Sequence, residues 1–128
     1  MKRIIPLFLC LAVFCSFPAF GASLKVARGV ITTRVVNRAP VDTVKTYAAT
    51  AGKLYCFTRI TGATTDTTIT HVWYHNGKEV ARVLLPVRSS DWRTWSSKKI
   101  SPRWTGSWKV DVLDADGNLL ATIPFTLI

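Results

Sequence analysis

The stretch that decides the fold is His71-Val-Trp-Tyr-His75, followed by Asn76-Gly77 and by Lys78-Glu-Val-Ala-Arg-Val-Leu-Leu85. Asn-Gly between two alternating apolar runs is a strong signal for a β-hairpin, because a type I′ turn needs positive φ at both central residues. A two-residue turn also sets the register of the two strands. The predicted pairs are His75 with Lys78, Tyr74 with Glu79, Trp73 with Val80, Val72 with Ala81, and His71 with Arg82.

Other segments of the chain repeat the strand pattern. β-branched residues fill 25–36 and end before Pro40, an apolar strand is expected over 54–61, and another over 92–100. Near the end, Trp108, Val110 and Val112 alternate before the turn Asp114-Ala-Asp-Gly117, and a returning strand follows over 119–127. These segments predict a second hairpin and no sustained helix.

About seven short strands in roughly one hundred residues indicate an all-β fold, a single antiparallel immunoglobulin-like β-sandwich. The alternative is an open five-stranded barrel of the oligonucleotide-binding type, which would need a helix that the sequence does not offer.

The first residues have the pattern of a secretory signal peptide. Met1-Lys-Arg3 is positive, residues 4–20 are apolar, and Ala19 and Gly21 supply small residues at a cleavage position. We therefore expect a leader over 1–21, cleaved after Gly21, and one domain over 22–128 in the periplasm or outside the cell. An uncleaved membrane anchor is the alternative.

The domain expected after cleavage is strongly basic. It keeps fifteen Lys and Arg against seven Asp and Glu, a net charge of +8. Such a charge favours anionic partners, and export favours an envelope component or an acidic protein over nucleic acid. Membrane contact is expected only at the surface. Cys10 and Cys15 fall in the leader, so Cys56 has no partner for an internal disulfide and is expected to be a buried, unreactive thiol.

Several short patterns, in this order, resemble the bacterial protein family DUF2914. They are His71-Val-Trp-Tyr with Gly77-Lys78, Trp92-Arg93 with Ser96-Ser97-Lys98, and Gly106-Ser-Trp108-Lys-Val110 with Asp116-Gly117 and Phe125. Arg38-Ala-Pro40-Val-Asp42 is similar to the opening of the same family, so the resemblance extends over about 28–126. It implies a small extracytoplasmic β domain and supplies no activity, cofactor or binding residue.

The hairpin has two faces, and which one is buried decides the candidate surface. One face carries Ile69, His71, Trp73, His75, Lys78, Val80, Arg82 and Leu84. The other carries Thr70, Val72, Tyr74, Glu79, Ala81, Val83 and Leu85, and we expect it to face inward because its lower half is more uniformly apolar. His71, Trp73 and Arg82 would then form an exposed binding surface. The alternative places Trp73 in the core, as in immunoglobulin-like domains.

A second concentration of aromatic and basic residues lies at 92–109. Four tryptophans in a core of this size cannot all be hidden, and exposed Trp beside Lys or Arg suits glycans or acidic polymers. The alternative is a solvated charged face with partly buried indoles. The predicted binding residues are therefore His71, Trp73, Arg82, Trp92, Arg93 and Lys98.

The patterns of catalysis and metal binding are missing from the sequence. His71 and His75 would lie about 13 Å apart along one strand, too far for one zinc ion. No nucleophile elbow, phosphate-binding glycine loop or telling carboxylate pair is found. We expect no cofactor and a non-catalytic binding or interaction module. The alternatives are a structural subunit of an envelope assembly and an enzyme with an unrecognised site around His71.

Overall fold

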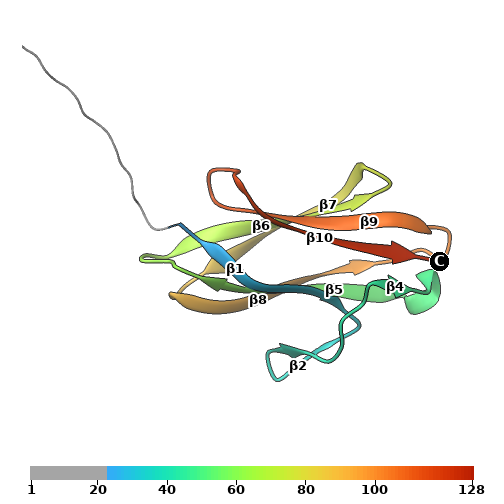
Figure 1. Cartoon of the computed structure of the whole chain (residues 1–128), viewed down its shortest axis with the longest axis horizontal. Helices are drawn as coiled ribbons and strands as arrows, with labels where there is room; N and C mark the ends of the chain where they lie inside the picture. Colours follow the sequence, from blue (N-terminus) through green and yellow to red (C-terminus); the bar gives the residue numbers. More distant parts are fainter. Residues whose placement is uncertain (1–22) are drawn as a thin grey trace, which may run out of the picture.

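A computed structural model describes residues 23–128 (Figure 1). The expected leader and its cleavage position lie outside the described residues. Within 23–128, no helix is long and apolar enough to cross a membrane.

Two sheets stack face to face to form the domain (Figure 1). The three-stranded sheet has the order β1-β5-β8, and the five-stranded sheet has the order β4-β10-β9-β6-β7. Seven strands of eight to ten residues build most of the described chain: β1 (Lys25–Thr32), β5 (Lys53–Thr61), β6 (Thr67–His75), β7 (Lys78–Val87), β8 (Asp91–Lys99), β9 (Gly106–Leu113) and β10 (Leu119–Leu127). The predicted all-β sandwich is confirmed.

The sheet order is that of an immunoglobulin-like sandwich. In the letters of that fold, β1, β5 and β8 stand for strands A, B and E, and β10, β9, β6 and β7 stand for G, F, C and C′. β4 (Thr46–Tyr47) adds a short parallel edge to β10. The helix that the barrel alternative requires does not form among the described residues, whose single helical segment is the 3₁₀ turn η2 (Ala49–Ala51).

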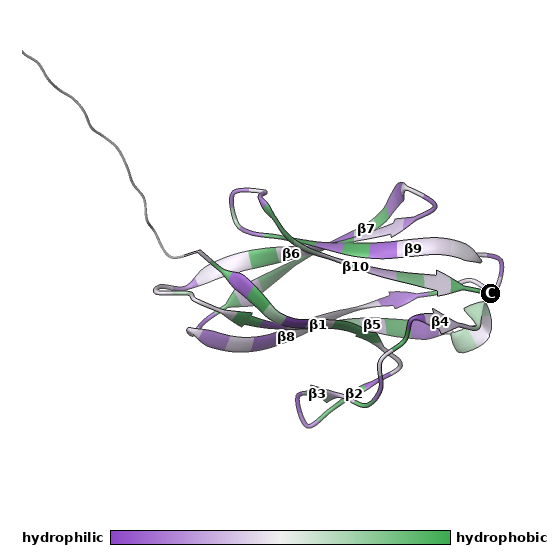
Figure 2. Cartoon of the chain, in the orientation of Figure 1, coloured by the Kyte–Doolittle hydropathy of each residue, from purple (hydrophilic) through white to green (hydrophobic). Residues whose placement is uncertain are grey.

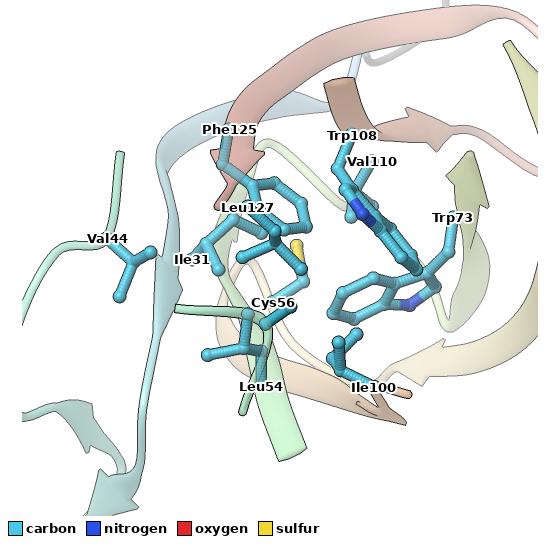
Figure 3. Close-up of a cluster of buried hydrophobic side chains, with 11 residues drawn as sticks. Ile31, Val44, Leu54, Cys56, Trp73, Ile100, Trp108, Val110, Phe125 and Leu127 are labelled. Atoms are coloured by element: carbon cyan, nitrogen blue, oxygen red, sulfur yellow. The ribbon is translucent and has the colours of Figure 1, made fainter. Parts of the chain in front are cut away.

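The larger buried cluster fills one half of the space between the sheets (Figure 3). Trp73 and Trp108 enter it from the five-stranded sheet, and Cys56 enters from β5. Its other buried members are Ile31, Val44, Ala49, Leu54, Ile100, Val110, Phe125 and Leu127. Because burial raises the pKa of the Cys56 thiol, this cysteine stays protonated and unreactive, as expected.

The β6–β7 hairpin has the predicted turn but not the predicted register. Asn76 and Gly77 both have positive φ, 49° and 82°, as a type I′ turn requires. His75 pairs with Lys78 and Tyr74 with Glu79, but a β-bulge then shifts the pairing by one residue. Trp73 consequently faces Ala81 rather than Val80.

The bulge also corrects the expected burial of the hairpin. Opposite Trp73, Val80 and Ala81 both pack against the core, so the alternation of β7 changes phase at this point. The prediction that Ala81, Val83 and Leu85 lie on the inner face agrees with their pairing opposite Trp73, His71 and Ile69. The prediction that β6 turns His71 and Trp73 outward is wrong, because both side chains are fully buried.

The single strand expected over 25–36 is divided into two strands in the structure. β1 ends at Thr32, and a small hairpin of β2 (Val35–Val36) and β3 (Ala39–Pro40) follows. Asn37 and Arg38 form its two-residue turn, both with positive φ. Asp42 ties the base of this hairpin to β1, because its carboxylate accepts hydrogen bonds from the side chains of Thr32 and Thr33 and from the backbone of Thr33.

Candidate functional site

The six binding residues predicted from the sequence do not form one surface. The structure separates them into four places: the core, the outer side of β7, the end of the sandwich, and the beginning of β8. The core takes two of them, since His71 and Trp73 have no exposed surface. Neither can touch a ligand in the folded protein.

His71 and Trp73 belong to a buried hydrogen-bond network that joins the two sheets. Ser96 Oγ on β8 lies 2.7 Å from His71 Nδ1 and accepts a 3.1 Å hydrogen bond from Trp73 Nε1. On the other side of the ring, Thr58 Oγ1 on β5 lies 3.1 Å from His71 Nε2 and donates to the carbonyl of Thr94 at 2.9 Å. Every polar side chain in this network has a partner.

The donors and acceptors fix one tautomer of His71. The Thr58 hydroxyl donates its single proton to the Thr94 carbonyl, so its oxygen must accept the hydrogen bond from His71 Nε2. Nδ1 then accepts from the Ser96 hydroxyl, whose oxygen accepts from the indole of Trp73. The ring is neutral, and burial lowers its pKa to about 4.

The Ser96–His71 pair has the distance of a nucleophile and its base, but it has no access to substrate. Ser96 and Thr58 are buried along with His71, and the larger surface hollows among the described residues are lined by other side chains. A reaction at Ser96 would require the two sheets to separate. The network therefore has the geometry of a structural lock between the sheets.

Arg82 lies on the outer side of β7 and does not form the expected binding surface with His71 and Trp73. The bulge places it opposite Val72 instead of His71. Its guanidinium makes two hydrogen bonds to Glu79, at 2.8 and 3.1 Å. The predicted cluster of His71, Trp73 and Arg82 does not form.

Lys98 lies in an aromatic cluster at the end of the sandwich. Its Nζ is 4.9 Å from the ring centroid of Trp104, which in turn stacks on His75 at 5.8 Å. The imidazole also lies 4.8 Å from Trp108, and its Nε2 donates to the carbonyl of Thr105 at 2.7 Å. These rings are engaged with one another and with the lysine, which leaves this cluster mainly a packing role.

Trp92 and Arg93, at the beginning of β8, lie on opposite faces of the strand: Arg93 is exposed, whereas Trp92 is half-buried and packs against a second buried cluster, which includes Ile60. The tip of the β2–β3 hairpin joins them. The Arg38 guanidinium carbon lies 5.8 Å from the Trp92 ring centroid, and Arg93 Nη1 donates to the carbonyl of Arg38 at 3.2 Å. Figure 1 shows this hairpin on the side of the three-stranded sheet that faces away from the five-stranded sheet.

Arg93 is one end of a line of three arginines that crosses the whole three-stranded sheet. Arg28 on β1 is directly opposite Arg59 on β5, and Arg59 is directly opposite Arg93 on β8. Along β5, Arg59 alternates with the inward residues Thr58 and Ile60 and so points outward. Directly opposite residues share a face, so Arg28 and Arg93 point outward as well. We call Arg28, Arg59 and Arg93 the arginine row; all three are exposed.

One acidic side chain contacts the arginine row. Asp91 accepts hydrogen bonds from Arg59 at 2.7 and 2.9 Å, and this pairing, with a smaller effect from Arg93, holds the pKa of Asp91 below its usual range. Both partners are about half exposed, and the pair cancels one of the three positive charges of the row.

The charge is unequally shared between the sheets. The strands of the three-stranded sheet hold seven lysines and arginines and one acid, Asp91, whereas β6, β7, β9 and β10 hold three against two. Figure 2 shows strongly hydrophilic segments along β1 and β8. The basic residues of the three-stranded sheet are Lys25, Arg28, Lys53, Arg59, Arg93, Lys98 and Lys99.

Residues 66–127 match the model of a protein family described as "Protein of unknown function (DUF2914)". Over this segment the chain is similar to the DUF2914 family. The matched segment runs from β6 to the end of β10, and it contains the patterns around Trp73, Trp92 and Trp108 on which the resemblance was based. No curated protein matches the chain.

The DUF2914 segment includes Arg93 but not the other two members of the arginine row. Arg28, Arg59 and the β2–β3 hairpin precede residue 66, so the row crosses the boundary of the matched segment. The expected resemblance over 28–65 is not part of this match. The family description assigns no activity to DUF2914 proteins.

Sequence reasoning named only Arg93 of the row. Arg28 and Arg59 are 31 positions apart in sequence, and nothing in their local patterns links them. Both arginines occupy outward positions of their strands, but they could be recognised as neighbours only with the knowledge that β5 lies between β1 and β8. Within residues 23–128, no group of three His, Cys, Asp or Glu side chains is placed to hold a metal ion.

Proposed function

We propose that this protein is a non-catalytic binding module that holds an anionic partner on the outer face of its three-stranded sheet. The observation that supports the proposal is the arginine row, three guanidinium groups directly opposite one another on three adjacent strands. Like charges in this position destabilise a sheet. An anion bound along the row would remove that repulsion.

Arginine is suited to this task. Its planar guanidinium forms paired hydrogen bonds with carboxylate, sulfate or phosphate groups, and it stays charged at every physiological pH. Arg38 extends the positive surface at the Arg93 end of the row, and the hydrogen bonds of Asp91 go to Arg59 in the middle of the row. The row thus offers several charge-assisted contacts to one extended ligand.

A non-catalytic role agrees with the burial of the one serine–histidine pair. Ser96 and His71 are closed off between the sheets, and each of their polar atoms is already used in the network. With the export expected from the N-terminal leader, the anionic partner would be a component of the cell envelope or an acidic protein.

The test is binding of labelled dextran sulfate, followed by fluorescence anisotropy, with neutral dextran as the ligand control. We expect binding to dextran sulfate alone, and a clear loss of affinity between roughly 50 and roughly 200 mM salt, because neutralising a polyanion releases its counterions. Tryptophan emission, to which Trp92 beside Arg38 contributes, provides a second readout.

Two triple variants locate the site. Replacing Arg28, Arg59 and Arg93 by Gln should weaken binding about tenfold or more. The matched control replaces Lys78, Arg82 and Lys109 by Gln, which removes the same charge from the five-stranded sheet and should change affinity less than about threefold. Equal losses in both variants, or no binding by the unmodified protein, would refute the proposal.

A further inference from the structure

We infer that the ligand of the arginine row is a linear acidic polysaccharide that lies across the strands of the three-stranded sheet. This inference rests on the proposed function and adds the chemical class and the direction of the ligand. It is drawn from the direction of the row, the occupied aromatic faces beside it, and the position of the β2–β3 hairpin.

The direction of the row selects an extended ligand that runs perpendicular to the strands. Neighbouring strands lie about 4.8 Å apart, so three arginines in adjacent strands offer three positive groups over about 10 Å. A linear polymer with one acidic group per sugar can meet these groups in succession. An acidic peptide that added to an edge of the sheet would run along β1 or β8 and would meet only one end of the row.

The aromatic rings near the row are already paired with other side chains. The Arg38 guanidinium lies over Trp92, and Trp95 stacks on Phe57 with ring centroids 6.3 Å apart and an 18° angle between planes. Binding of single-stranded nucleic acid relies on open aromatic faces for its bases. This surface offers charge and hydrogen bonds instead, so a polymer of acidic sugars would be held through its acidic groups and not by stacking on tryptophan.

The hairpin limits the shape of the ligand. Phe57 points to the outer face by its register, opposite Trp95 and Val30, yet it is only 2% exposed. Trp95 stacks on Phe57 and contributes to this burial, and the tip of the β2–β3 hairpin, which lies on the outer side of the sheet, reaches Arg93 (Figure 1). A hairpin that stands out from the sheet beside the row would keep a flat membrane surface away from the arginines.

The hairpin tip itself carries a strained residue. Arg38 adopts φ 62°, a left-handed conformation that non-glycine residues rarely take, and it holds its side chain beside Trp92 and its carbonyl on Arg93. Such strain is often found in ligand-holding segments. In the inferred complex, Arg38 would be the fourth cation along the bound polymer.

The experiment compares five probes at equal concentration of negative charge: polygalacturonate, galacturonic acid monomer, an oligothymidylate, polyglutamate, and vesicles of phosphatidylglycerol with phosphatidylcholine. We expect polygalacturonate to bind most tightly, the monomer not to bind measurably, and the affinity for polygalacturonate to fall about tenfold or more in the R28Q/R59Q/R93Q variant. The control variant K78Q/R82Q/K109Q should retain it. Circular dichroism checks that both variants are folded.

Asp91→Asn supplies a test in the opposite direction. It frees Arg59 from its carboxylate partner, so it should tighten binding of polygalacturonate about two- to fivefold while it lowers stability slightly. Arg38→Ala should weaken binding by a similar factor. A purely structural role of the row would not produce a gain from D91N.

The outcomes separate the two proposals. Tighter, row-dependent binding of the oligothymidylate, polyglutamate or vesicles would overturn the polysaccharide assignment and leave the anion-binding function standing. Binding of no probe, or polygalacturonate binding that is unchanged in the row variant, would overturn both. Equal binding of monomer and polymer would overturn the crossing geometry.

Discussion

Trp73 Nε1 donates a 3.1 Å hydrogen bond to Ser96 Oγ, from the five-stranded sheet to the three-stranded sheet. The same oxygen lies 2.7 Å from His71 Nδ1, so one small hydroxyl serves two of the six side chains that the sequence suggested for ligand binding. Their role is to hold the sheets together.

Ser96→Ala should destabilise the fold by about 1–3 kcal/mol, since it leaves the Trp73 indole and His71 Nδ1 buried without a partner. Urea unfolding measures the loss. Ser97→Ala is the matched control: Ser97 is exposed on the same strand, and its replacement should change the free energy of unfolding by less than about 0.5 kcal/mol. Equal effects would show that the network contributes nothing specific.

Stability should fall on mild acidification because of His71. The folded-state pKa is about 4, below the ordinary value of 6.5, so between these pH values the unfolded chain binds a proton that the folded chain refuses. The contribution is fully present above pH 6.5 and declines as the pH falls toward 4, by about 3 kcal/mol in total.

This pH dependence is measured by urea unfolding at several pH values. The pKa values of several carboxylates, including those of Asp42 and Asp91, are also lowered. Their contributions to stability are lost at a lower pH, so they do not explain a change in the free energy of unfolding above pH 5. His75→Gln should leave the pH dependence of the free energy of unfolding unchanged. Nitrogen-15 NMR should find His71 neutral, with its proton on Nε2, at pH 5.5; a protonated ring in the folded protein at that pH contradicts the prediction.

Arg38→Gly should be more stable than Arg38→Ala by about 1 kcal/mol. Both variants lose the contact with Trp92, but only Ala retains the cost of a left-handed conformation. The difference in thermal unfolding between the two variants measures the free-energy cost of the left-handed backbone conformation at this position. If Ala were the more stable variant, the turn would have to adopt a different conformation in solution.

Arg28→Gln should raise stability by a few tenths of a kcal/mol, up to about 1, because it removes one of two directly opposed arginine pairs. Lys25→Gln on the same strand is the control, since Lys25 is opposite Thr61 and no cation. Denaturant midpoints at low salt show the difference most clearly, and added salt should reduce it. A destabilised R28Q would argue that the row already makes favourable contacts in the isolated protein.

Local sequence determined the strands, the two hairpins and the sandwich. Asn76-Gly77 specified a turn with two positive φ values, and the alternation of Val110 and Val112 specified which side of β9 is buried, because both signals act between residues close in the chain. The DUF2914 patterns are of the same local kind and lie within the matched segment.

Only the tertiary structure decided which surface is available for binding. The bulge opposite Trp73 was not readable, because one extra residue in β7 reverses the facing of all residues beyond it. Ser96 and Thr58 lie on other strands than His71, and their hydrogen bonds offset the free-energy cost of burying the imidazole. The arginine row, likewise, arises only when the sheet order places β5 between β1 and β8, since cross-strand neighbours are set by long-range pairing and not by sequence distance.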